Sequence, residues 1–179
     1  MGNVETLRPQ DVIVILKLVA NSDQANWTYA ELSKKLFRST SHVFRSVARA
    51  EAARLLSVPS FAIGRIEGVS PFARPNLGNL TEFLVHGLKY CFPAERGGIT
   101  RGVPTAHAAP PLDQQMVQSS ELPPVWPFAE GRVRGIKLLP LHKNALQAAL
   151  RDPKLYELLA LVDAIRDGRA REVETGPAN

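Results

Sequence analysis

The chain has 179 residues, of which 45% are hydrophobic and 22% charged, a composition typical of a globular protein rather than a low-complexity chain. No apolar run approaches the roughly 20 residues of a transmembrane helix, and the N-terminus lacks the layout of a secretion signal. Cys91 is the only cysteine, which excludes an intramolecular disulfide and a cysteine-rich zinc site. We therefore expect a cytoplasmic protein with no membrane association.

The whole chain has a formal net charge of +5 at pH 7. The positive excess lies in its first two thirds. Residues 1–56 hold eight basic and five acidic residues, residues 57–112 hold five and three, and residues 113–179 hold nine of each. We expect a polyanionic partner to meet the first two segments and a different partner to meet the neutral last third.

Two short helices are predicted near the N-terminus. The first covers residues 8–20, because Pro9 suits a first helical turn and apolar residues recur behind it at helical spacing. The second covers residues 28–36, where Thr28 is placed to cap the helix and Glu31 completes a capping box three residues later.

A third predicted helix follows a tight turn and carries the most informative pattern in the chain. Its apolar side repeats at Val43, Val47 and Ala50. At about 100° per residue, the other side gathers basic and hydroxyl-bearing residues, which suits a helix that enters a DNA groove. The predicted DNA-binding residues are Arg38, Ser39, Thr40, Ser41, His42, Arg45, Ser46 and Arg49. A solvated face without a partner is the alternative, although Glu51 is the only acid against four arginines between residues 38 and 56.

The segment after the third helix, residues 57–68, alternates weakly between apolar and polar residues. It forms either a β-hairpin wing or an extended linker, since Pro59, Gly64 and Gly68 disfavour a long regular hairpin. Arg65 is the only strong candidate in this segment for a contact with a DNA backbone.

The N-terminal third of the chain resembles the winged helix-turn-helix domain of bacterial, broadly MarR-like, transcription regulators. The segments that carry this resemblance are the first predicted helix, TYAELSKKL and STSHVFRSVARAEAARLL. The resemblance spans about residues 7–66 and predicts a DNA-binding domain over residues 1–68. It implies that residues 39–49 read the major groove of double-stranded DNA and that a wing touches the backbone. It also implies a sequence-specific regulator, in the form of a repressor, that binds palindromic operators as a homodimer.

Residues 69–179 are predicted to form a helical C-terminal part that receives a signal or a partner protein. The expected elements, in chain order, are a helix over 77–91 capped by Asn76, a short turn and strand over 126–127 and 131–139, and helices over 144–150 and 153–167. A segment rich in Pro and Gly, residues 93–125, is expected to lack regular structure and to be either functional or disordered. The predicted fold class is therefore mainly α with a small β component.

Within that segment, Arg96, Gly97, Gly98 and Arg101 form the one loop suited to an anion. Glycines let a backbone approach a ligand, and two arginines can clamp an anion. The Gly-Lys-Ser/Thr ending of a nucleotide-binding P-loop is absent. We expect a contact loop for a partner protein, for DNA phosphates or for the protein's own C-terminal part. A nucleotide site and internal pairing of the arginines are the alternatives.

No arrangement of side chains suited to catalysis is apparent. The four histidines are scattered without the spacing of metal ligands. Cys91 ends an apolar helical stripe and is expected to be buried and inert. The sequence therefore predicts no enzymatic activity, no metal and no cofactor.

The apolar stripe of residues 155–165 is the first-ranked candidate for a dimer interface, because the neutral C-terminal third would not repel its own copy. Burial in the core of the C-terminal part fits the stripe equally well. The alternative function is a protein-interaction adaptor, or an antitoxin partner in a toxin–antitoxin or phage-defence system.

Overall fold

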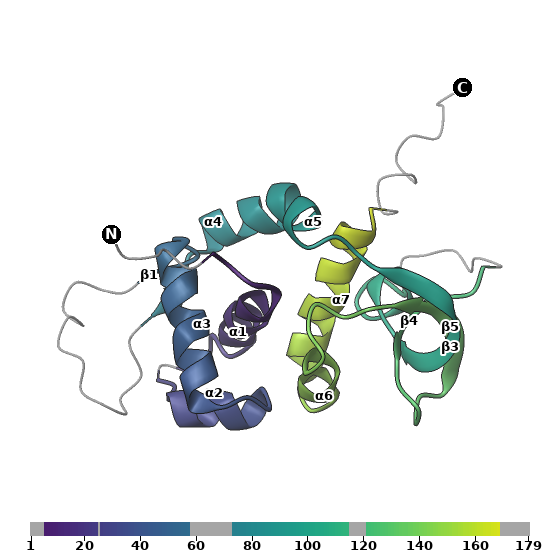
Figure 1. The fold of residues 1–179 in the computed structure, drawn as a ribbon, viewed down its shortest axis with the longest axis horizontal. Coiled ribbons are helices and arrows are strands. Elements are labelled where there is room, and N and C mark those ends of the chain that lie inside the picture. Colours follow the sequence, from purple (N-terminus) through teal and green to yellow (C-terminus); the bar gives the residue numbers. More distant parts are fainter. Residues whose placement is uncertain (1–5, 25, 58–72, 115–120, 169–179) are drawn as a thin grey trace. The chain divides into compact units, whose positions relative to one another are not determined.

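The computed structural model describes residues 6–24, 26–57, 73–114 and 121–168, and the fold is mainly α with a small β component, as predicted. The chain divides into two compact units (Figure 1). The first unit is Met1–Glu82 with Leu141–Arg151, and the second is Phe83–Pro140 with Asp152–Asn179. The expected domains were residues 1–68 and 69–179. The first unit instead extends to Glu82, and the chain returns to it at Leu141–Arg151.

Three helices form the framework of the first unit, and α3 packs against both α1 and α2 (Figure 1). Their bounds are α1 Pro9–Ala20, α2 Tyr29–Lys35 and α3 Thr40–Ala52. The predicted cap of the second helix is confirmed, because the Thr28 hydroxyl accepts a hydrogen bond from the Glu31 N–H at 3.1 Å. The Ser39 hydroxyl caps α3 by accepting a hydrogen bond from the His42 N–H at 3.3 Å. The buried apolar side chains include Val12, Ile15, Leu16, Leu32, Leu36, Val43 and Val47.

The turn between α2 and α3 is a Schellman-type helix end. Phe37 has a φ of 54°, in the left-handed region where glycine is usual. The Arg38 N–H donates to the Ser33 carbonyl at 3.0 Å and satisfies an otherwise unpaired group of α2. This turn separates α2 from α3 by only a few residues, as the sequence predicts for these two helices.

Residues 141–151 pack against this same turn within the first unit. They contain α6, Ala145–Leu150, close to the helix predicted over 144–150. The Asn144 side-chain amide donates to the Phe37 carbonyl at 2.9 Å, and the Arg151 guanidinium lies 5.0 Å from the centroid of the Phe37 ring. The turn is therefore held by a segment far from it in the sequence.

Two short strands follow α3. Strand β1, Leu56–Ser57, pairs antiparallel with β2, Arg74–Pro75. The expected wing or linker at 57–68 falls within the described residues only at Ser57, and its remainder, including Arg65, lies outside them.

The helix predicted over residues 77–91 forms in three pieces: α4 Leu77–Glu82, a π-helical turn Phe83–Gly87 and α5 Leu88–Cys91. The Asn76 side chain caps it by accepting from the Asn79 N–H at 3.2 Å. The prediction that Cys91 is buried is wrong, since this thiol is exposed. The π-helical turn changes the phase of the helix, so a stripe counted at 3.6 residues per turn does not continue to its end.

The second unit contains three strands that close on one another, and two of them lie where no regular structure was predicted. Strand β3, Arg96–Pro104, pairs antiparallel with β4, Pro124–Pro127, and with β5, Val133–Leu138, while β4 and β5 pair in parallel. The expectation of an irregular segment at 93–125 is therefore wrong for β3 and β4. Glycines permit the tight closure, because a Cβ on Gly102 or Gly135 would overlap the backbone carbonyl of Trp126 or Pro123.

Helix α7, Pro153–Asp167, has the predicted bounds and ends at Gly168, whose φ is 74°. The Asp152 carboxylate accepts hydrogen bonds from the backbone N–H groups of the first helical turn. Leu155, Leu159 and Val162 are buried within the chain. The stripe over 155–165 is therefore core at these positions, and the expectation that it faces a second copy is wrong there.

Candidate nucleic-acid interface

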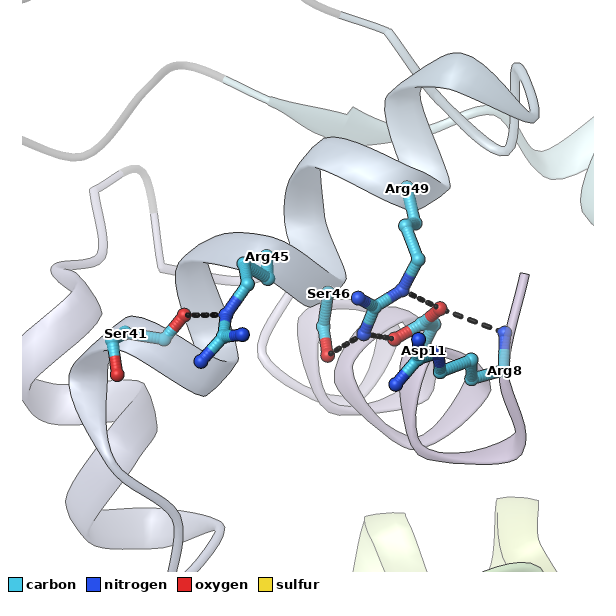
Figure 2. A network of polar contacts seen from close by, with 6 residues as sticks. All are labelled: Arg8, Asp11, Ser41, Arg45, Ser46 and Arg49. Atoms are coloured by element: carbon cyan, nitrogen blue, oxygen red, sulfur yellow. Dashed lines mark hydrogen bonds and ion pairs between the residues drawn. The ribbon is translucent and has the colours of Figure 1, made fainter. Parts of the chain in front are cut away.

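The exposed side of α3 begins at its N-terminus. Thr40, Ser41, His42, Arg45 and the capping Ser39 are exposed. The Ser39 and Ser41 hydroxyls lie 3.2 Å apart, and the Arg45 Nε donates to the Ser41 carbonyl at 3.4 Å. Figure 2 shows Arg45 lying along α3 beside Ser41. These five residues place hydroxyl, imidazole and guanidinium groups together on the first two turns of the helix.

Two residues assigned to this face by the sequence lie on the other side of the helix. Arg49 and Ser46 point toward α1 (Figure 2), where the Arg49 Nε and Nη2 donate to the two Asp11 carboxylate oxygens at 2.7 and 2.8 Å. Arg49 is 6% exposed and Asp11 is fully buried. The prediction that Ser46 and Arg49 bind DNA is wrong, because α1 covers them and a buried carboxylate requires a cation.

The sequence did contain a signal for this ion pair. Asp11 stands directly before the apolar residues of α1 and accepts a hydrogen bond from the Arg8 N–H at 2.8 Å, as expected of an acid in a first helical turn. Its burial between the helices, however, calls for a second, charged partner. An arginine on the packed side of α3 is the side chain able to provide two parallel hydrogen bonds to it.

Arg38 is half-buried in the turn before α3 and is less available than predicted. Its Nε and Nη1 atoms are buried and have no hydrogen-bond partner among the described residues. Burial, together with the charge of Arg49, lowers the pKa of the Arg38 guanidinium, while Asp11 opposes that change. Arg38 therefore does not lie on the exposed side of α3 in the way that Arg45 does.

The first unit has further exposed cations on α2, directly after α3 and on β2. Lys34 and Lys35 end α2, Arg54 follows α3, and Arg74 starts β2. Together with Arg45 on α3, they give the first unit exposed positive charge at several places along the chain. Such an arrangement can meet a polyanion, with Arg45 and the hydroxyl groups of α3 close to it.

The second predicted set, Arg96 to Arg101, is a strand rather than a contact loop, and the expected loop is wrong. Arg96 forms an ion pair with Asp167 at the end of α7, and its Nε donates to that carboxylate at 2.6 Å. Internal pairing, the alternative considered for these arginines, is therefore confirmed for Arg96. Gly97 and Gly98 are exposed positions on β3, and Arg101 is exposed on the same strand.

A buried polar cluster in the second unit has no counterpart in the predictions. The Asp163 carboxylate accepts hydrogen bonds from the Thr105 hydroxyl at 2.7 Å, the Trp126 Nε1 at 2.6 Å and the Arg166 Nη1 at 2.8 Å. Burial raises the pKa of Asp163, and these three donors oppose the rise. Because the donors come from Thr105, β4 and α7, the cluster ties α7 to other parts of the second unit.

Among the described residues, no group of three or more His, Cys, Asp or Glu side chains is arranged to hold a metal ion. Over the same residues, no helix has the length and apolarity needed to cross a membrane.

Comparison of the chain with protein-family models, with curated proteins and with solved structures finds no match. The interpretation of the exposed side of α3 therefore depends on its own geometry.

Proposed function

We propose that the protein is a sequence-specific transcription regulator, a repressor, that binds double-stranded DNA through α3. The observation that carries this proposal is the exposed N-terminal half of α3, which presents Ser41, His42 and Arg45 directly after a tight turn. In helix-turn-helix proteins, the N-terminal residues of the second helix contact base edges in the major groove.

Each exposed group on α3 has a suitable role in such a complex. An arginine donates two parallel hydrogen bonds to guanine, the commonest specific contact in the major groove. Hydroxyl groups such as those of Ser39, Thr40 and Ser41 serve as donors to phosphates or bases. Arg49, by contrast, holds α3 against α1 and so orients the helix that carries Arg45.

The surrounding cations supply contacts that do not depend on DNA sequence. Lys34, Lys35, Arg54 and Arg74 are exposed and suited to backbone phosphates, which fix the register of a protein on the duplex. The β1–β2 pair directly follows α3, at the place in the chain where the wing of a winged helix begins. A homodimer would present two copies of α3 to a palindromic operator.

One observation favours the second candidate, a protein-interaction adaptor or an antitoxin partner. Phe44 is 39% exposed on α3, and its ring lies 5.4 Å from that of Tyr29. An exposed aromatic side chain beside polar groups is typical of a protein-binding surface. DNA binding remains our first proposal because the neighbouring exposed side chains are basic or carry hydroxyl groups.

A binding titration of the full chain against its own upstream DNA at fixed salt tests the proposal. The Arg45→Ala variant should lose about 1–3 kcal/mol of binding free energy if Arg45 contacts a base edge. Lys89→Ala, which removes a positive charge from the second unit, is the matched control and should bind like the original protein. Equal affinity of the Arg45→Ala variant and the control, or binding that does not weaken with salt, would favour the adaptor instead.

A further inference from the structure

Two arginines face each other across adjacent strands of the second unit. Arg101 on β3 is the direct antiparallel partner of Arg134 on β5, and both side chains are exposed. Opposed residues in an antiparallel pair project to the same face, with Cβ atoms about 4.5–5.5 Å apart. Arg132 is also exposed and lies two residues before Arg134, so it adds a third cation beside the pair.

The opposite face of these strands is closed to large side chains. Gly102 and Gly135 are buried where the backbone carbonyls of Trp126 and Pro123 approach most closely. Since successive residues of a strand alternate between faces, the arginines that precede these glycines lie on the outer face. Ile99, 53% exposed, accompanies them there and is paired with Ile136.

Among the described residues, this arrangement of like charges has no internal explanation. Like charges directly opposite one another destabilise a sheet, and within the described residues no ion pair or side-chain hydrogen bond joins Arg101, Arg132 or Arg134 to an acid. Glu130 is the acid nearest in the sequence to Arg132 and Arg134, Glu95 is the acid nearest to Arg101, and both are exposed. Arg96 on the same strand shows the contrast, because it is paired with Asp167.

We propose that this outer face, formed by Arg101, Arg132 and Arg134, binds the phosphate backbone of a nucleic acid. Guanidinium groups donate two parallel hydrogen bonds to phosphate oxygens, and an anion between them removes their mutual repulsion. A nucleic acid is favoured over an acidic protein because Ile99 is the one strongly exposed apolar side chain described on this face, whereas protein interfaces bury several. The inference does not depend on the role of α3, which belongs to the first unit.

The experiment is a titration of the full chain with a short DNA duplex of random sequence at several salt concentrations. The Arg101→Gln/Arg134→Gln variant should bind at least several-fold more weakly at low salt. The slope of log affinity against log salt should shrink by about 1.8, because each phosphate contact contributes about 0.9. Lys89→Ala/Lys143→Ala, which removes the same charge elsewhere, should change both quantities little.

A variant that matches the original protein in affinity and salt slope overturns the proposal and leaves an acidic protein as the candidate partner. A lower melting temperature of the Arg101→Gln/Arg134→Gln variant also overturns it, because the two arginines would then be structural. The Arg45→Ala variant distinguishes the contribution of this surface from that of α3. Its preference for the upstream DNA over random-sequence DNA should fall. Its salt slope on random-sequence DNA should stay the same, because the arginines of the second unit are still present.

Discussion

Each unit buries one arginine–aspartate pair, and the two pairs are built differently. Arg49 and Asp11 join two helices that are distant in the sequence, through two parallel hydrogen bonds. Arg166 and Asp163 lie on the same helix, three residues apart, and each reaches outward to other elements. Asp163 accepts from Thr105 and Trp126, while Arg166 donates to the Phe92 and Pro93 carbonyls.

The difference shows two ways to satisfy a buried charge. In the first unit Arg49 is the charged side chain that donates hydrogen bonds to Asp11, so the pair joins α1 to α3 and depends on both members. In the second unit the carboxylate has three donors, from Thr105, β4 and α7, so the aspartate is a hub and the arginine is one of its partners. The penalty for removing a member should follow this asymmetry.

The largest effect is expected from Asp163→Ala. The change leaves the buried Arg166 charge, the Thr105 hydroxyl and the Trp126 N–H without their shared acceptor, so we expect a loss near the upper end of about 3–5 kcal/mol. Urea unfolding followed by tryptophan fluorescence measures it. Asp163→Asn is the control, since it keeps an acceptor and should cost less. Equal stability of the alanine variant and the original protein would contradict the hub assignment.

Arg49→Ala should cost somewhat less, about 3 kcal/mol. It leaves Asp11 buried without its charged partner, but the Arg8 N–H still donates to that carboxylate. The informative comparison is the double variant Arg49→Met/Asp11→Leu, which removes both charges and fills the space with apolar groups. It should recover most of the loss in the same unfolding measurement. A double variant as unstable as Arg49→Ala would mean that the pair is more than a matched set of charges.

The Arg49–Asp11 pair illustrates which features the sequence predicts and which it does not. The helices α1, α2, α3, α6 and α7 and the caps at Thr28 and Asn76 depend on neighbouring residues, and their positions were predicted closely. Which side of α3 is buried depends on α1, a contact between segments far apart in the sequence. Periodicity alone assigned Arg45 and Arg49 to the same side of α3. In the structure Arg45 is exposed, while Arg49, four residues later, is buried against Asp11.

Strand β5 lies within the strand predicted over 131–139, whereas β3 and β4 were missed for a related physical reason. Glycine and proline are depleted in most strands, so Arg96–Pro104 and Pro124–Pro127 suggested irregular chain. These strands pair with segments that are far away in the sequence. Their glycines allow two backbones to approach closely and do not form turns. The pairing of Arg101 with Arg134 depends on this register, and no local pattern predicts it.

A smaller effect is expected at Tyr156, which lies near the hub of the second unit. Its hydroxyl donates to the Pro104 carbonyl at 2.6 Å, and its ring lies 5.7 Å from that of Trp126. Tyr156→Phe removes the hydrogen bond and retains the ring, so it should cost about 1 kcal/mol in urea unfolding. Glu157→Gln, at an exposed neighbouring position, is the control. A loss as large as that of Asp163→Ala would mean that Tyr156 belongs to the hub.

The smallest predicted effect is a pH dependence that belongs to the first unit. Burial, then the charges of Arg38 and Lys143, lowers the pKa of His142 below its usual value. The His142 Nδ1 also accepts a hydrogen bond from the Asn144 N–H at 3.3 Å, which a protonated ring would lose. The folded state therefore binds this proton more weakly than the unfolded chain does. The contribution of His142 to stability is present above the usual histidine pKa of about 6.5 and is lost as the pH falls through the lowered value.

Urea unfolding at a series of pH values from about 7 down to about 5, where an unperturbed histidine gains its proton, measures this contribution. The original protein should lose stability over that interval, and His142→Gln should lose less. His86→Gln, at an exposed position in the second unit, is the matched control and should follow the original protein. A parallel loss of stability in His142→Gln and the original protein would contradict this prediction. The neutral ring of His142 would then not stabilise residues 141–151 against the turn before α3. The pH dependence would come from another group in the chain.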